Sequence, residues 1–301
     1  MGDAPDETHL QVRVRWWHGW GLLLAVPWSV MLLPSTTPRW VVMWTLAFAI
    51  FVGCRWLTWR RTPAPLTPLW RHLAYLFGWP GLDAVAFLRG GPTVSRPTIR
   101  EWGFALSKFV VGLMLMFGVA RLVPEAYPYV VGWVGMIGIV MTLHFGLFHL
   151  LSCGWRAWGI DARPLMNWPL TAVGVGEFWG RRWNTAFRDL TYRFLFRPVT
   201  RRIGPTVALL VGFAFSGLVH DLVISLPAGG GYGGPTLFFL IQGLAVFVER
   251  SRIGKRLGLG SGWRGWAFTA GSMLATVGLL LHAPFVVGVV VPFLAALGAI
   301  G

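Results

Sequence analysis

The sequence predicts an all-α, polytopic transmembrane protein, and three observations support this prediction. Hydrophobic residues make up 55% of the 301-residue chain, charged residues only 12%, and the mean hydropathy is +0.61. Soluble domains contain about 25% charged residues. Several apolar runs reach the roughly 20 residues with which a helix crosses a bilayer. The 19 Trp and 21 Phe exclude intrinsic disorder, and two Cys are too few for a disulfide-built secreted scaffold.

We expect eight spans, joined in one membrane-embedded domain that covers residues 1–301. Residues 1–15 are polar and of mixed charge, so we expect a cytoplasmic tail and no cleaved signal peptide. The first and sixth spans are short. The eight spans are placed at 19–34, 40–59, 104–123, 129–153, 206–226, 235–249, 266–282 and 284–300.

The cationic residues determine the expected orientation. Of the 26 Lys and Arg, 24 lie in the N-terminal tail and in segments 55–108, 154–205 and 250–265, and the other two are Arg39 and Arg121. Cytoplasmic loops carry an excess of Lys and Arg, so we expect these segments and both termini in the cytoplasm. The net charge of +15 then reflects membrane topology, and no nucleic-acid partner is expected. The expected location is a bacterial inner membrane.

Two cytoplasmic segments combine aromatic residues with Arg. In residues 64–88 the spacing of Leu and Trp is typical of an amphipathic helix at headgroup depth. Residues 164–204 carry seven Arg among dense aromatic side chains. A loop of that composition would not remain fully solvated, so we expect an interfacial or re-entrant segment.

His220 lies about 15 residues into the fifth expected span, at a depth where ionisable side chains are costly. Ser216 lies one turn earlier on the same helix face and can satisfy the imidazole, and Asp221 follows directly. Two interpretations stay open from these residues: a functional histidine with a supporting partner, or a hydrogen-bonded pair that packs two helices together.

The remaining histidines and cysteines predict no metal site. His144 and His149 are five residues apart and therefore lie on different helix faces, unlike the i, i+4 pair of helical zinc sites. We expect structural roles for both, with the lining of an active cavity as the alternative. Cys54 and Cys153 end their spans without a surrounding ligand cluster.

The strongest local signal is the run from Phe178 to Asn184, Phe-Trp-Gly-Arg-Arg-Trp-Asn, with Arg188 shortly after it. Guanidinium groups bind phosphate with a forked pair of donors. Indole faces can stack on a purine or form the wall of an acyl groove, and an Asn amide both donates and accepts. An aromatic belt with snorkelling Arg would explain each residue singly but not their concentration here.

This run, with Ser-Gly-Leu-Val-His-Asp over residues 216–221, resembles the membrane-bound O-acyltransferase superfamily, and within it the wax-synthase branch. The similarity covers residues 176–250. It implies that His220 is the catalytic base and that Asn184 is the second signature residue. Asp221 stands where the family often has Glu. The implied co-substrate is acyl-CoA, with no bound cofactor.

The resemblance implies transfer of a fatty acyl group from acyl-CoA to the hydroxyl of a long-chain lipid alcohol within the membrane lipids. His220 would take the hydroxyl proton, Asn184 would hold the thioester carbonyl or its oxyanion, and either Asp221 or Ser216 would orient the ring. Alternative acceptors are diacylglycerol, a sterol or a small metabolite that takes acetyl, and the rival from another class is a transporter. The side chains expected to bind substrate are Phe178, Trp179, Arg181, Arg182, Trp183 and Arg188.

Overall fold

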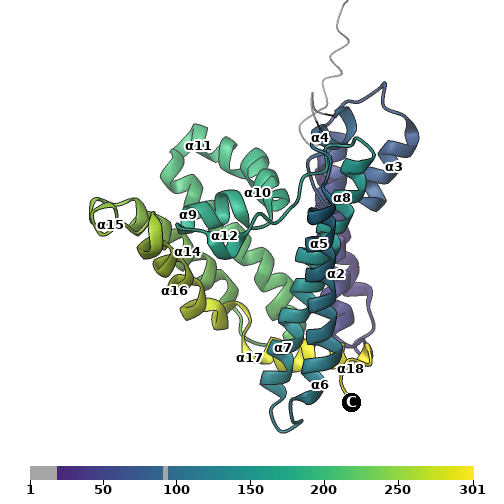
Figure 1. The fold of residues 1–301 in the computed structure, drawn as a ribbon, viewed down its shortest axis with the longest axis vertical. Coiled ribbons are helices and arrows are strands. Elements are labelled where there is room, and N and C mark those ends of the chain that lie inside the picture. The colour runs from purple at the N-terminus through teal and green to yellow at the C-terminus, as the bar shows by residue number, and fades with distance from the viewer. Residues whose placement is uncertain (1–18, 91–93) are drawn as a thin grey trace, which may run out of the picture.

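The computed structural model describes residues 19–90 and 94–301 and, over these residues, consists of helices without strands (Figure 1). The predicted all-α class is confirmed. The polar tail predicted for residues 1–15 lies outside the described residues.

Four helical runs are long and apolar enough to cross a bilayer, so the chain is a polytopic membrane protein. Each corresponds to a predicted span. The longest contains a π-helical turn, η3 (Met141–Leu147), between α7 (Pro128–Val140) and α8 (Phe148–Ala157). The four runs are α2 (Arg39–Arg60), α5 to α6 (Ile99–Leu122), α7 to α8 (Pro128–Ala157), and α12 through η7 to α13 (Pro205–Ala228).

The predicted count of eight spans is not confirmed, because the other apolar helices are short or bent. The first, α1 with η1 (Trp20–Leu32), is interrupted by Pro27. Helix α14 (Gly234–Arg250) has 17 residues and ends with two charged ones. Helix α16 (Gly262–Leu280) is followed after a 60° bend by α17 to α18 (Ala283–Ala296), so this pair counts as at most one span.

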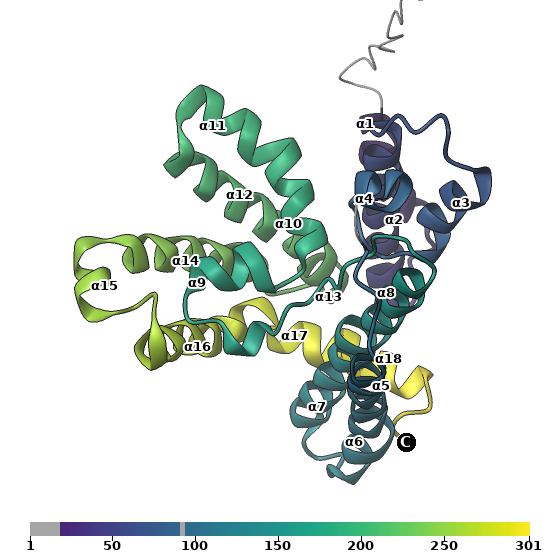
Figure 2. The same ribbon diagram turned by 45° about the horizontal axis from the view of Figure 1, so that its top comes forward.

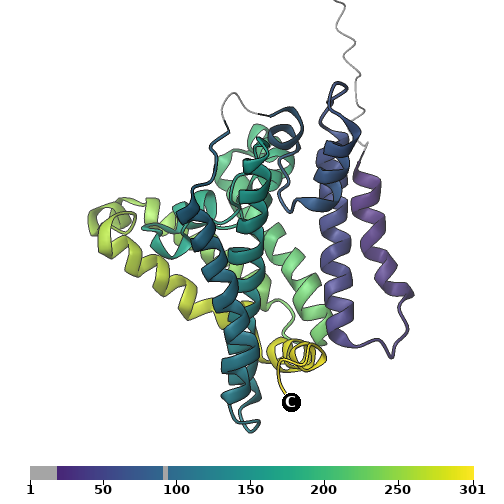
Figure 3. The ribbon, with the colours of Figure 1, turned by 45° about the vertical axis from the view of Figure 1, so that its right-hand side comes forward.

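The end of the chain lies away from the cationic loops. The Nε of Arg121 donates to the carbonyl oxygen of Ala299 at 2.9 Å, so the last residues lie beside the end of α6 (Figure 3). The expected return of span 284–300 to the cytoplasmic side is therefore not confirmed. Arg39, the other cation outside the basic segments, donates through Nη1 to the carbonyl oxygen of Ala228 at 2.9 Å. Both guanidinium groups thus satisfy carbonyls at helix ends.

The helices form two groups that are separate in Figure 2. One contains α5, α7 and α8, and the other contains α12, α14 and α16, with α12 packed along α14. Helix α2 belongs to neither group: it packs on α1 and contacts η7 and α13. The basic segment 164–204 folds over the second group as short helices instead of a solvated loop. These are α9 (Val175–Glu177), η5 (Phe178–Arg182), α10 (Thr185–Thr191), η6 (Tyr192–Phe196) and α11 (Arg197–Ile203).

The predicted interfacial segment 64–88 forms two short helices, α3 (Leu69–Gly78) and α4 (Ala84–Arg89). Helix α3 buries Tyr75 completely, whereas Phe77 is 83% exposed. An exposed apolar side chain of this size suits the headgroup region of a bilayer. A buried guanidinium, Arg55, donates through Nη1 to the carbonyl oxygens of residues 75 and 76 and attaches α3 to α2.

The close approach of α12 to α14 requires a glycine at 217. A Cβ on Gly217 would lie 2.5 Å from the backbone Cα of Thr236. We expect Gly217→Ala to destabilise the fold by about 1–3 kcal/mol, because the two helices must separate. Thermal unfolding in detergent micelles measures this. Gly271→Ala on α16, where a Cβ meets no atom within 4 Å, is the matched control. Equal melting temperatures for the two variants would contradict this packing.

Candidate active site

A cavity of about 640 Å³ lies between the two helix groups, and its wall is mainly apolar. One side is formed by α2 and η3, and the other by η5, α10, η6, α12 and α14. A volume of this size is typical of small-molecule sites. It brings together residues far apart in sequence, including the predicted Ser216, His220, Trp179, Trp183, Asn184 and Arg188.

The imidazole of His220 is held in one tautomer. Its Nδ1 lies 2.7 Å from the backbone carbonyl oxygen of Ser216, and a carbonyl can only accept a hydrogen bond. In the neutral imidazole Nδ1 therefore carries the proton, and Nε2 has the lone pair. Nε2 has no hydrogen-bond partner among the described residues. The ring also packs on Phe239, with the centroids 4.6 Å apart. The cavity thus contains an oriented imidazole whose Nε2 has no partner among the described residues.

Asp221 caps a helix and is not hydrogen-bonded to the His220 ring that it was expected to orient. Its carboxylate accepts from the backbone N–H groups of Gly233 at 2.8 Å and Thr236 at 3.0 Å, and from the hydroxyls of Thr236 and Ser225. These contacts cap the N-terminus of α14 and attach it to η7 (Asp221–Ser225). Of the two candidates for orienting His220, the structure favours Ser216, through its backbone carbonyl and not its hydroxyl.

Asn184 adopts a left-handed backbone conformation, with φ of 40°, which Asn tolerates better than most residues. Its side-chain Oδ1 accepts from the backbone N–H of Phe187 at 3.3 Å and so caps α10. The amide Nδ2 has no partner within residues 19–90 and 94–301. Asn184 and His220 line the same cavity.

Two aromatic residues of the Phe178–Asn184 run line the cavity, and the third packs against those two. Trp179 and Trp183 line the cavity, whereas Phe178 is not among the lining residues. Phe178 stacks on Trp183, with the ring centroids 5.6 Å apart and the planes at 12°, and contacts Trp179 edge-on. It supports both indoles from behind.

The guanidinium of Arg182 is bonded to residues of its own loop. It pairs with Glu177, with Nη2 2.7 Å from Oε1, and Nη1 donates to the hydroxyl of Thr171 at 2.6 Å. Burial alone would raise the pKa of Glu177, but the Val173 backbone N–H and the Arg182 guanidinium outweigh it and hold that pKa below its ordinary value. These partners make Arg182 a brace of the loop that carries Trp183 and Asn184.

Arg188 and Arg181 lie at a second, more polar cavity, also of about 640 Å³. Arg188 lines both cavities, and its Nη1 donates to the carbonyl oxygen of Gly180 at 2.7 Å. Arg181 lines the second cavity alone. Burial raises the pKa of the neighbouring Asp189, and the ion pair with Arg188 opposes that rise. The predicted Arg residues therefore do not form one cluster.

The lining residues outside the predicted site include two with basic side chains, Arg250 and His144. Arg250, the last residue of α14, is exposed and lines the first cavity. In the sequence it is one charge among several in segment 250–265, without a distinguishing signal. His144 lines the cavity from η3. The sequence offers the lining of an active cavity as the alternative role of His144, and the structure agrees with that alternative.

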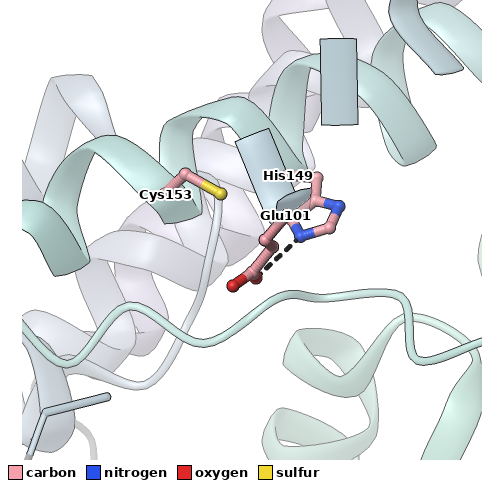
Figure 4. A group of neighbouring side chains, drawn as sticks. All are labelled: Glu101, His149 and Cys153. Carbon is pink, nitrogen blue, oxygen red and sulfur yellow. Dashed lines mark hydrogen bonds and ion pairs between the residues drawn. The ribbon is translucent and has the colours of Figure 1, made fainter. Parts of the chain in front are cut away.

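Glu101, His149 and Cys153 place their ligand atoms within 4.8 Å of one another (Figure 4). Two cations already engage this group. The Nζ of Lys108 lies 2.7 Å from Nδ1 of His149, and Arg156 pairs with Glu101, which also lies 3.0 Å from Nε2 of His149. We interpret the group as an ion-pair network that joins α5 to α8, since a dication there would face both cationic side chains.

A family model described as the membrane bound O-acyl transferase family matches residues 162–241. These residues include the Phe178–Asn184 run and His220. The resemblance to this family is confirmed.

This chain is similar to curated proteins named as long-chain-alcohol O-fatty-acyltransferases. It is 33% identical over 100 residues to a long-chain-alcohol O-fatty-acyltransferase of Simmondsia chinensis, covering 30% of this chain and 28% of that protein. A probable long-chain-alcohol O-fatty-acyltransferase 7 of Arabidopsis thaliana is 29% identical over 140 residues, 40% of each chain. A probable long-chain-alcohol O-fatty-acyltransferase 3 of Arabidopsis thaliana is 26% identical over 172 residues, which are 52% of this chain and 48% of that protein. The match spans less than half of each relative.

The capping role of Asp221 predicts a stability defect for Asp221→Ala. Removing the acceptor of the α14 N-terminal amides should cost about 1–2 kcal/mol, seen as a lower melting temperature in detergent micelles. Asp221→Asn keeps one acceptor oxygen and should lose less. An Asp221→Ala protein as stable as the wild type would show that the cap contributes nothing.

Proposed function

We propose that this protein is an integral-membrane O-acyltransferase that moves a fatty acyl group from acyl-CoA to the hydroxyl of a long-chain alcohol. The observation that carries the proposal is the pairing, in one apolar cavity, of an imidazole with a free Nε2 and an amide with a free Nδ2. The names of the relatives support the reaction and the acceptor class.

The two groups serve complementary parts of an acyl transfer. Nε2 of His220 accepts the proton of the alcohol as its oxygen attacks the thioester carbonyl, and the Asn184 amide donates to the oxyanion that develops. The C–S bond then breaks, and the proton passes from His220 to the departing CoA thiolate. One C–O bond forms, one C–S bond breaks, and no further reactant is needed.

The cavity suits one charged and one uncharged reactant. We place its cationic end at the cytoplasmic face, in line with the positive-inside bias. Arg188 and Arg250 there would bind the phosphates of acyl-CoA. The acyl chain would lie along the apolar wall, where each CH₂ removed from water contributes about 0.8 kcal/mol.

His220→Ala should abolish ester formation, with a loss of at least about 100-fold, because the general base is removed. The assay uses membranes that contain the protein, labelled palmitoyl-CoA, and hexadecanol, diacylglycerol or a sterol as acceptor. His72→Ala controls for the loss of a histidine, since His72 accepts from Trp59 outside the cavity. An active His220→Ala protein would refute the mechanism. A folded wild type that esterifies none of the acceptors would refute the proposed function.

Arg250→Ala should raise the KM for palmitoyl-CoA about tenfold and change kcat little, because one charge-assisted hydrogen bond to phosphate is lost. Arg252→Ala, an exposed cation two residues further on, is the matched control. The effect should shrink at high salt. Identical KM values for the two variants would remove Arg250 from the CoA site.

A further inference from the structure

His144 faces the candidate site from the opposite wall. His220 and Asn184 come from α12 and from the start of α10, in the second helix group. His144 belongs to η3, in the first group, and lines the same cavity. Helix α2 completes this side of the lining with Ala47, Ile50 and Phe51, which are apolar. His144 is therefore the polar contribution of this wall.

The ring of His144 lacks polar partners within the protein. Neither ring nitrogen forms a hydrogen bond with any described residue, and Nδ1 is fully buried. Its recorded ring contact is edge-on to Phe148, with centroids 5.3 Å apart. A buried polar group without a partner is costly, and more so at membrane depth. Nδ1 is buried away from the cavity, whereas Nε2 is not fully buried and has no partner among the described residues. An Nε2 left unpaired on a residue that lines a cavity is explained if a bound molecule supplies the partner.

His149, a histidine close in sequence, differs from His144 in its hydrogen bonding. It lies five residues further along the same helical run, and both of its nitrogens are engaged, by Lys108 and by Glu101. The protein thus satisfies one intramembrane histidine completely with its own side chains. The other is left open toward the cavity.

The chemistry of the two reactants decides which one meets His144. The phosphates of acyl-CoA require cations, and Arg188 and Arg250 both belong to the second helix group. The thioester would follow to Asn184 on the same side. An uncharged alcohol suits the apolar wall of α2. A neutral imidazole offers one N–H and one lone pair. A hydroxyl that donates to His220 still has two lone pairs, one for attack and one to accept an N–H.

We propose that His144 binds the hydroxyl of the acceptor alcohol and positions its oxygen between Nε2 of His220 and the thioester carbonyl. The inference rests on the proposed function and adds the residue that recognises the acceptor. His144 is then a substrate-binding residue on the wall opposite the base.

The test replaces the ring nitrogens and keeps the ring. His144→Phe should raise the KM for hexadecanol about tenfold, as expected for one lost hydrogen bond to a buried hydroxyl. The KM for palmitoyl-CoA should stay within about twofold. His144→Gln, with a donor and an acceptor, should restore part of the hexadecanol affinity, and His144→Leu replaces His144→Phe if that protein does not fold. His149→Gln is the matched control, which should lower stability without raising the hexadecanol KM.

A second measurement is independent of turnover. Hexadecanol alone should raise the melting temperature of the wild type and not that of His144→Phe. If the wild type forms ester and His144→Phe keeps both the hexadecanol KM and the stabilisation, the inference is overturned and the proposed function stands. If the wild type forms no ester but only the wild type is stabilised, the alcohol site stands and the proposed function fails. Equal stabilisation of both proteins, without ester, overturns both.

Discussion

Polar groups inside a bilayer must find partners within the protein, and the architecture of this chain depends on that constraint. Asp221 lies within a candidate span and accepts four hydrogen bonds, of which the three from Gly233 and Thr236 bind η7 to the start of α14. Arg39 and Arg121 donate to carbonyls at helix ends. The Lys108–His149–Glu101 network joins α5 to α8. Each of these contacts connects elements that the apolar side chains alone would leave free to slide, because lipid competes for apolar contacts.

The cavity contains the exceptions to this requirement that polar groups have partners within the protein. The Nε2 of His220, the Nδ2 of Asn184 and the ring of His144 keep hydrogen-bonding capacity that no described residue uses. Two of these side chains are held in place by a hydrogen bond that another of their own atoms forms. His220 is fixed through Nδ1, and Asn184 through Oδ1. Groups held in this way lose little freedom when a substrate binds.

Several of the cavity's side chains come from π-helical turns or lie next to one. His144 lies in η3, Trp179 in η5, and His220 immediately precedes η7. A π turn inserts one extra residue into a helix and rotates the side chains that follow. In a spanning helix this redirects a polar residue toward the interior without breaking the backbone hydrogen bonds.

Composition and hydropathy alone determined the helical membrane class and the positions of four spans, because crossing a bilayer requires about 20 apolar residues whatever the tertiary fold. The sequence also singled out His220, because ionisable side chains are costly at membrane depth, and Asn184, through its aromatic and Arg-rich run and the resemblance to the acyltransferase superfamily. Only the tertiary structure decided that these two share a cavity, that Asp221 caps α14, and that Arg182 braces its own loop. It also decided the bend before Ala283 and the place of the last residues. Which polar groups become hydrogen-bond partners depends on which helix faces meet, and hydropathy does not determine that.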